Sequence, residues 1–510
     1  MPVNSQNSKR IEIINADKTY ANTNLHPEYL RLVGSIIFKH NNSIMKCDSA
    51  HHFINNDIIK AFSNIKINQG DSIKLYGEKL IYNSQENEAI LTKDVIFIDN
   101  QIQLTTNKIV YDLNNKSAFY PKNGEIKNQD KNISSKKGKY FANKNEFVFN
   151  DSVIIKGKNY IIRTKNMIYD SKREIAFFKG PSKIISDDRL LYCENGWYDT
   201  KNNIAQIKKN AFIQKKAYKL IGDSIYYNKI NNYAKAIQNV YLIDSVENIE
   251  LSGQKAEYFE LLKKTEVYEN PILKIMIQED TLFMRAEKFI SLQEEKKNKK
   301  VIAHKDVKFF KYDLQGKCDS LIYSVQDSTS EMFVKPVIWS NNLQIIADSI
   351  KIQFNQGKID NVTLRSRPFL SSKIDSIFFN QIKGKTMDIF FKNNNLDKII
   401  VFGNGESLYT IQENETEKVK AINYTKSSNL TLFFKKNQLN SINYILKPDS
   451  NTIPIDKINN ENKFLKGFLW RGDEKPNDKN DIYWITTIDV LLFFSLPAWE
   501  LFNSIGLDSP

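Results

Sequence analysis

An aromatic residue recurs at a fixed interval through much of this chain, and this period constrains the fold more than any other feature. It falls at Phe53, Tyr82, Tyr111, Tyr140, Tyr169, Tyr198 and Tyr227, in steps of 29 residues (82 − 53, and so on), and continues more loosely at Tyr258, Phe289 and Tyr323. A constant period over so many positions is typical of a repeat architecture, in which each unit buries its apolar face against its neighbours.

Within each repeat, apolar and polar residues alternate and then slip by one position. In the first full copy the apolar or small residues are Ile73, Leu75 and Gly77, then Leu80 and Tyr82. Alternation indicates a strand with one buried face, and the slip indicates a bulge or bend. The residue at the bend is usually small: Gly77, Thr106, Ser135, Thr164, Cys193, Gly222, Gly253, Met284, Cys318 and Ala347. We expect each strand to turn a corner there and to pass into a second, facing sheet.

The rest of each repeat predicts a polar turn and a return strand. The turn often opens with Asn or Asp, which suit turns because their side chains bond to the local backbone: Asn83, Asp112, Asp170, Asp199 and Asn228. Further along, Asp or Asn usually stands just before another apolar run: Asp94, Asn123, Asn210, Asn239 and Asn270. The sequence therefore predicts an all-β fold, an elongated antiparallel β-jellyroll of bent hairpins of about 29 residues, stacked into two facing sheets.

The pattern also predicts the domain organisation. Residues 1–10 are polar and expected to be disordered, and residues 11–447 form one continuous repeat array, clearest over 44–354 and looser over 355–447. Residues 448–510 form a C-terminal tail, either a final packing segment or a docking segment for a partner. The chain opens without an apolar signal segment, and no run reaches the ~20 apolar residues of a membrane helix.

The sequence lacks the residue constellations that are typical of enzymes. His51 and His52 are adjacent on a predicted strand and so point to opposite faces. There is no CxxC, HExxH, GxSxG or glycine-rich phosphate loop. Cys47, Cys193 and Cys318 lie on distant repeats, too far apart for the ~5.5 Å Cα separation of a disulfide. We therefore predict no enzymatic activity, no cofactor and no metal.

The net charge of +14 favours an acidic partner, such as a phosphorylated lipid, a nucleic acid or a membrane surface. Lysine on the outward face of the strands explains the same charge without a dedicated partner. The repeat tyrosines lie on the apolar phase of the strands, where core residues lie, and not where an exposed base-stacking platform would be. We therefore predict no binding of nucleic acid.

Two creased sheets enclose a long interior that is either filled by side chains or open along one side. An open interior would be an apolar trough with Lys and Arg at its lip, suited to an amphiphile with acyl chains and an acidic head group. The unpaired strand edges at either end of the array suit strand addition by a partner. The residues expected to line the groove are Leu75, Leu80, Tyr82, Leu104, Ile109, Tyr111, Ile162, Met167 and Tyr169.

The units SIKLYGEKLIYNSQENEAILTKDVIFI and YKLIGDSIYYNKINNYAKAIQNVYLI resemble the OstA-like family of lipopolysaccharide transport. The shared pattern is I-x-[GA]-[DE]-x-[IL]-x-Y-[DN], a small residue, then [GDN]-x-V, and the resemblance covers about residues 11–447. It implies a β-jellyroll that holds lipopolysaccharide or a related glycolipid by its acyl chains. It also implies end-to-end joining with other transport proteins, and a location in the periplasm or at the periplasmic face of the outer membrane. The length and the separate tail are similar to the long OstA-like proteins of Bacteroidota-type bacteria.

Two hypotheses follow from the sequence. The first is a non-enzymatic protein that binds or bridges lipid in lipopolysaccharide transport to the outer membrane. The alternative is a structural or adhesive β-repeat scaffold with a sealed core and no lipid ligand. An accessible apolar interior would distinguish the carrier from the scaffold.

Overall fold

A computed structural model describes residues 10–21, 28–128, 130–186, 188–277, 280–293, 299–356, 358–392, 395–413, 418–435 and 438–483. The chain divides into two compact units, residues 1–237 and 238–510, and strand β19 (Tyr233–Asp244) crosses the boundary between them. Both units are built of antiparallel strands, which confirms the all-β class and the bent-hairpin β-jellyroll. Residues 1–9, predicted to be disordered, and the apolar stretch after residue 483 lie outside the described residues.

Unit 1 consists of strands and one short helix. They are β1 (Glu12–Asn15), β2 (Lys18–Tyr20), β3 (Leu30–His40), β4 (Ser43–Phe53), β5 (Ile58–Gln69), β6 (Ile73–Asn83), β7 (Glu88–Asp99), β8 (Ile102–Asp112), β9 (Ser117–Tyr120), β10 (Gly124–Asn128), β11 (Lys131–Ser135), β12 (Lys137–Phe141), the 3-10 helix η1 (Ala142–Lys144), β13 (Glu146–Lys156), β14 (Ile161–Asp170), β15 (Ile175–Ile185), β16 (Leu190–Asp199), β17 (Ile204–Lys215) and β18 (Tyr218–Asn228).

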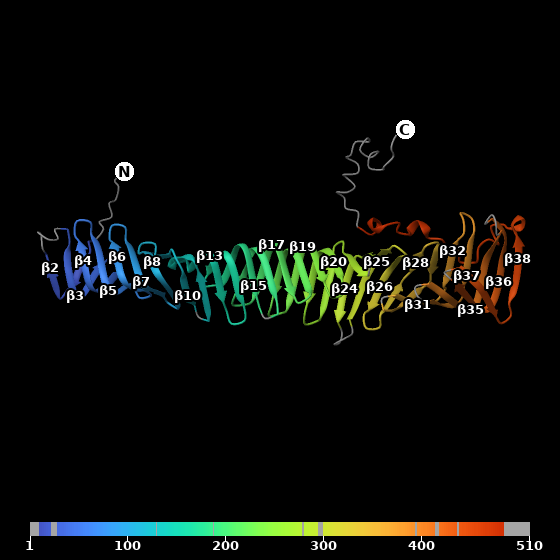
Figure 1. The fold of residues 1–510 in the computed structure, drawn as a ribbon, viewed down its shortest axis with the longest axis horizontal. Coiled ribbons are helices and arrows are strands. Elements are labelled where there is room, and N and C mark those ends of the chain that lie inside the picture. The colour runs from blue at the N-terminus through green and yellow to red at the C-terminus, as the bar shows by residue number, and fades with distance from the viewer. Residues whose placement is uncertain are drawn as a thin grey trace, which may run out of the picture. The chain divides into compact units, whose positions relative to one another are not determined.

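Neighbouring strands of unit 1 pair in chain order, as the meander in Figure 1 shows. At the start, β1 and β2 both pair with β3. Between β8 and β13 the corner is broken, so that β8 pairs with both β9 and β10, and β13 with both β11 and β12. The predicted turn residues are confirmed: Asn83 Oδ1 accepts the backbone N–H of Gln85 at 3.0 Å, and Asp199 Oδ1 accepts that of Asn202 at 2.8 Å.

The corner of each hairpin lies mainly in the return strand. In β7, Lys93 and Asp94 have φ of 67° and 46°, and these two residues face the single residue Asn107 of β8. The same left-handed pair recurs at Ser63–Asn64, Asp151–Ser152 and Lys209–Asn210. The sequence prediction placed the corner at the small residues of the outgoing strand, but Gly77 there does not have a left-handed φ. Asn and Asp tolerate the left-handed region better than most residues, which explains their recurrence in the return strand.

The strands of unit 1 bend far enough for their two ends to meet. A straight strand of the length of β6 would span roughly 35 Å. The register nevertheless places His40, Ser43, Gln69 and Ile73 in one row of strand ends, and the hydroxyl of Tyr82, at the other end of β6, hydrogen-bonds with Nδ1 of His40. The two halves of each strand therefore lie in two facing layers. We call the edge where their turns meet, opposite the corner, the closing edge.

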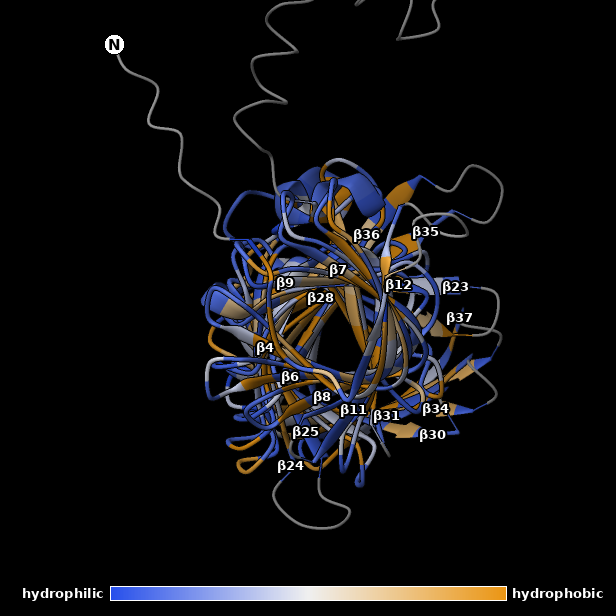
Figure 2. Ribbon diagram, turned by 90° about the vertical axis from the view of Figure 1, so that its left-hand side faces the viewer, coloured by the Kyte–Doolittle hydropathy of each residue, from blue (hydrophilic) through white to orange (hydrophobic). Residues whose placement is uncertain are grey.

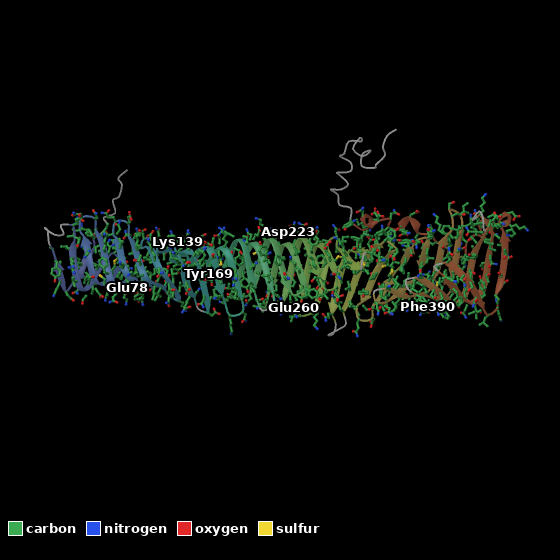
Figure 3. All side chains as sticks on the ribbon, viewed as in Figure 1. Glu78, Lys139, Tyr169, Asp223, Glu260 and Phe390 are labelled. Atoms are coloured by element: carbon green, nitrogen blue, oxygen red, sulfur yellow. The ribbon has the colours of Figure 1, made fainter. Side chains whose placement is uncertain are left out.

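The core lies between these layers. Along β6 and β8 the inward residues are buried and alternate with exposed or half-buried ones. Hydrophobic residues are concentrated on the strands, whereas most of the outer turns are hydrophilic (Figure 2). Tyr169 is buried in this core, while Glu78, Lys139 and Asp223 are exposed (Figure 3).

Unit 2 follows the same plan with more interrupted strands. They are β20 (Ile249–Phe259), β21 (Lys264–Tyr268), β22 (Ile272–Ile277), β23 (Asp280–Arg285), β24 (Lys288–Gln293), β25 (Lys299–Lys311), β26 (Leu314–Ser324), β27 (Thr329–Phe333), β28 (Val337–Ser340), β29 (Leu343–Ile346), β30 (Ser349–Asn355), β31 (Lys358–Arg365), β32 (Phe369–Lys373), β33 (Phe379–Lys383), β34 (Thr386–Lys392), β35 (Asn395–Gln412), β36 (Val419–Lys435), β37 (Gln438–Ile445) and β38 (Asp449–Pro454), followed by the 3-10 helices η2 (Ile455–Lys457), η3 (Gly472–Glu474) and η4 (Lys479–Ile482). Strand β38, which follows the predicted boundary at residue 447, pairs with β36.

The tail after β38 returns over the outer face of unit 2, where it runs above β25, β28 and β32 (Figure 1). Gln381 bonds to two backbone groups of the tail, donating to the carbonyl of Lys463 at 3.1 Å and accepting from the N–H of Leu465 at 2.8 Å. Gln344 does the same further along, with the carbonyl of Leu469 at 2.7 Å and the N–H of Arg471 at 2.7 Å. We call residues 463–474 the strap.

Candidate functional site

All nine residues predicted to line a groove lie in the interior of unit 1. They come from β6, β8 and β14, and none has more than 3% of its surface exposed: Leu75, Leu80, Tyr82, Leu104, Ile109, Tyr111, Ile162, Met167 and Tyr169. None of them lines either of two cavities that the described part of unit 1 has near the corner. Their side chains therefore pack within the closed interior, and their contact with a lipid stays a prediction.

A row of tyrosine hydroxyls joins the two layers at the closing edge. Tyr82 bonds with His40, Tyr111 donates to Gln69 Oε1, and Tyr140 donates to Asp99 Oδ2 at 2.9 Å. The partners are separated by 42, 42 and 41 residues (82 − 40, 111 − 69, 140 − 99). Each hydroxyl bond thus connects the end of an outgoing strand to the end of a strand that lies about one and a half repeats earlier in the chain.

Burial raises the pKa of these hydroxyls. Desolvation raises the pKa of Tyr82, Tyr111 and Tyr140 well above the usual range, and the nearby carboxylate of Asp99 raises that of Tyr111 and Tyr140 further. A protonated hydroxyl remains a donor, so the links at Tyr111 and Tyr140 persist across the physiological pH range.

A buried ion pair continues the same edge. Lys131 Nζ bonds to Glu174 Oε2, and the two residues are only 5% and 8% exposed. Burial acts to lower the pKa of Lys131, but the hydrogen bond and the charge of Glu174 outweigh it and raise that pKa. Nearer the N-terminus, Gln69 Nε2 also donates to the carbonyl of Leu113 at 2.8 Å. The closing edge of unit 1 is therefore held shut by hydrogen bonds and charge.

Three later strands of unit 2 end in a different aromatic residue. The aromatic that ends the outgoing strand is phenylalanine at Phe354, Phe391 and Phe434, each half-buried, and a phenyl ring has no hydroxyl to donate. The half-buried apolar residues packed against the core of this unit also include Leu314, Leu343, Leu439 and Ile442. We call these residues the apolar rim. Sequence reasoning noticed the change from tyrosine to phenylalanine only as a looser period.

The cysteines do not form a reactive site. Cys47, Cys193 and Cys318 are free thiols buried in the core, and burial raises the pKa of each to about 12. Over the part of the chain that the structure describes, no cluster of three or more His, Cys, Asp or Glu residues could hold a metal ion. In the same part of the chain, we find no helix with the length and apolar character needed to cross a membrane.

Comparison with known proteins agrees with the repeat pattern. Residues 8–165 match the family model described as OstA-like protein. This part of the chain is OstA-like. The OstA-like part contains β1 to β14 up to residue 165, and with them the closing-edge tyrosines Tyr82, Tyr111 and Tyr140.

One solved structure with similarity is LptH from Pseudomonas aeruginosa, described as the LptA homologous periplasmic component of the conserved lipopolysaccharide transport device. The match covers 28% of this chain and 93% of that chain, with 10% sequence identity and a TM-score of 0.22. A search of curated proteins found no match to the chain.

Proposed function

We propose that this chain is a non-enzymatic lipid-binding protein that holds the acyl chains of lipopolysaccharide, or of a related glycolipid, between its two layers. The observation that carries the proposal is the OstA-like repeat itself, which folds into facing layers with a continuous apolar interior. The nine buried residues of unit 1 would contact acyl chains once the closing edge opens. Lysine and arginine, in excess in this chain, would meet the acidic head group.

The proposed place of action is the periplasm or the periplasmic face of the outer membrane, with other lipopolysaccharide-transport proteins as partners. Within the described residues, β1 and β2 pair only with β3, and β37 and β38 pair only with β36. These strands therefore leave backbone donors and acceptors free on one side. Such edges suit end-to-end strand addition by a partner.

A second candidate is a structural scaffold with a sealed core, and one observation favours it. The predicted groove residues are at most 3% exposed, and the closing edge beside them is bonded shut. A core that never opens would need no ligand. The two candidates differ in whether the interior takes up lipid.

The test is lipid mass spectrometry on protein purified under mild conditions from its native envelope. The carrier predicts stoichiometric lipid A species, which Leu80→Asp should abolish, because this change puts a charge into the interior. Ile81→Asp is the matched control, since Ile81 is the next residue of β6 and is 46% exposed on the other face.

Leu80 is fully buried, so its substitution by Asp could unfold unit 1. Phe391→Asp, at the half-buried apolar rim, is therefore the second variant, and circular dichroism is recorded for all three. Folded wild-type protein that carries no lipid and takes up no added lipopolysaccharide would rule out the carrier and leave the scaffold.

A further inference from the structure

We propose that the outer face of unit 1, over strands β8 to β17, binds an anionic saccharide, meaning a sugar chain that bears carboxylate or phosphate groups. The site lies on the outer face, near the corner, and does not depend on lipid in the interior. It combines three features that lie next to one another on the sheet: a hollow lined by hydroxyl groups, an unpaired cluster of cations and an aromatic platform.

The hollow consists of two adjoining cavities of about 670 Å³ and 320 Å³, which share Ser152. The larger cavity is lined mainly by short polar side chains, among them Thr105 and Ser134, which the strand register places on either side of Glu125. Thr105, Glu125 and Ser134 belong to one row of side chains that runs across the strands on the outer face, which we call the outward row. The short side chains in this row leave the surface concave. Hydroxyl groups both donate and accept hydrogen bonds, as sugar hydroxyls require.

The cations line the smaller cavity. Arg163 of β14 and Lys183 of β15 stand directly opposite each other in the strand register, and both are exposed. Neither forms an ion pair with a residue of the described chain, and like charges in this position destabilise a sheet. Asp151, which also lines the cavity, is already engaged by Lys136 at 3.0 Å, and the hydrogen bond from Lys136 lowers its pKa. An anionic ligand would relieve the repulsion between Arg163 and Lys183.

The aromatic platform is next in the same outward row. Tyr192 of β16 pairs in register with Lys183 and, on its other side, with Phe212 of β17. The two half-buried rings stack with centroids 5.2 Å apart and an interplanar angle of 18°, and Lys219 lies 4.3 Å from the centroid of Phe212. An aromatic face packs against the apolar face of a sugar ring, and its flanking cations are placed for the acidic substituents.

The same features favour a saccharide over a single-stranded nucleic acid. A nucleic-acid groove stacks successive bases on several aromatic side chains along a basic track. Here one stacked pair stands at one end, and the track beyond it is a hydroxyl-lined hollow that also contains the carboxylates of Asp94 and Glu125. These carboxylates would repel a continuous phosphate backbone, whereas a saccharide with spaced anionic groups can avoid them.

The experiment is isothermal titration calorimetry of the full-length chain with hexagalacturonate and with pentamannose 6-phosphate, neither of which carries an acyl chain. Neutral maltohexaose and the oligonucleotide dT12 are the comparison probes. We expect at least one anionic saccharide to bind at least tenfold more tightly than both comparison probes. The double variant Arg163→Gln/Lys183→Gln should weaken that binding at least tenfold, and Tyr192→Ala should weaken it too.

The matched control is Lys66→Gln, because Lys66 is also a lysine beside an aromatic ring, 5.7 Å from the centroid of Tyr76, away from the hollow. It should leave the dissociation constant unchanged. Removing the like-charge pair should also leave the melting temperature of the free double variant equal to or above that of the wild type, which a purely structural role would not produce. The proposal is overturned if neither anionic saccharide binds at 5 mM, if Lys66→Gln weakens binding as much as the double variant, or if dT12 binds more tightly.

Discussion

The buried ion pair at the closing edge offers the clearest test of how that edge is held. Replacing Lys131 by Met keeps most of the side-chain volume but leaves the carboxylate of Glu174 buried without its cation. Breaking a buried pair on one side costs about 3–5 kcal/mol. We expect the lower end, about 3 kcal/mol, because the second acidic partner of Lys131, Asp130, is 65% exposed and is solvated by water when the lysine is lost.

The assay is hydrogen exchange with mass spectrometry, which measures local opening peptide by peptide. A loss of about 3 kcal/mol corresponds to roughly 100-fold faster exchange in peptides from β11 to β14, with peptides of unit 2 unchanged. Lys136→Met is the matched control: the Lys136–Asp151 pair is exposed, so its loss should change exchange by less than about fivefold.

The double variant Lys131→Met/Glu174→Gln completes the cycle. With both charges gone, the remaining penalty should fall to about 1 kcal/mol. If Lys131→Met accelerates exchange no more than Lys136→Met does, the pair behaves like a surface pair, and the description of a desolvated, closed edge is wrong.

Three further predictions concern single side chains. Tyr140→Phe leaves Asp99, which is 5% exposed, without its hydroxyl donor, and should lower the free energy of unfolding of unit 1 by about 1–3 kcal/mol in urea, in contrast to the exposed Phe119→Leu. Glu474 has a pKa lowered from 4.5 to about 2, chiefly by its hydrogen bond with Arg471. The stability that the ionised Glu474 carboxylate adds is therefore complete above pH 4.5 and is lost as the pH falls towards 2. The melting temperature of Glu474→Gln should converge with that of the wild type over this pH window. A difference in melting temperature that stays constant would contradict the lowered pKa of Glu474. Gln381→Leu removes the two bonds from Gln381 to the strap backbone and should make trypsin cleave faster after Lys463 in the folded protein, and unchanged cleavage would mean that these two bonds do not hold this part of the strap.

Much of the fold follows from sequence, because it depends on local rules that each repeat obeys again. The aromatic period and the alternation in the first copy predict the strand ends that β6 and β8 adopt. The Asn and Asp turn residues were predicted from their local bonding, and Asn83 and Asp199 bond as expected. The left-handed pairs could also have been predicted, since the recurring Asp94 and Asn210 are residue types that tolerate positive φ.

Whether the interior of unit 1 is open or closed depends on contacts between residues that are far apart in the sequence, and a local sequence pattern does not reveal such contacts. Alternation predicts that Leu80 and Tyr111 point inward, but not whether the two layers meet at the far edge. The polar residues His40, Gln69, Asp99 and Asn128 do recur at strand ends at intervals of 29 or 30, and this was a usable signal for a bonded edge. The strap had no such signal, because the glutamine amides that hold it lie 82–127 residues away in the chain. Nothing in the repeat period indicates the division into two units either.

The spacing of the hydroxyl links has a consequence for how such a chain can change in length. In a simple stack of repeats, each repeat touches only its neighbours, and stability is a sum of adjacent terms. Here each tyrosine reaches back about one and a half repeats, so that Tyr111 of β8 ties itself to the end of β5. A duplicated segment of 29 residues would bring its own donor and its own acceptor, both in phase with the existing row. An insertion of any other length within the row would move donors and acceptors out of phase on both sides of it, so growth by whole repeats is the change that this edge accommodates most easily.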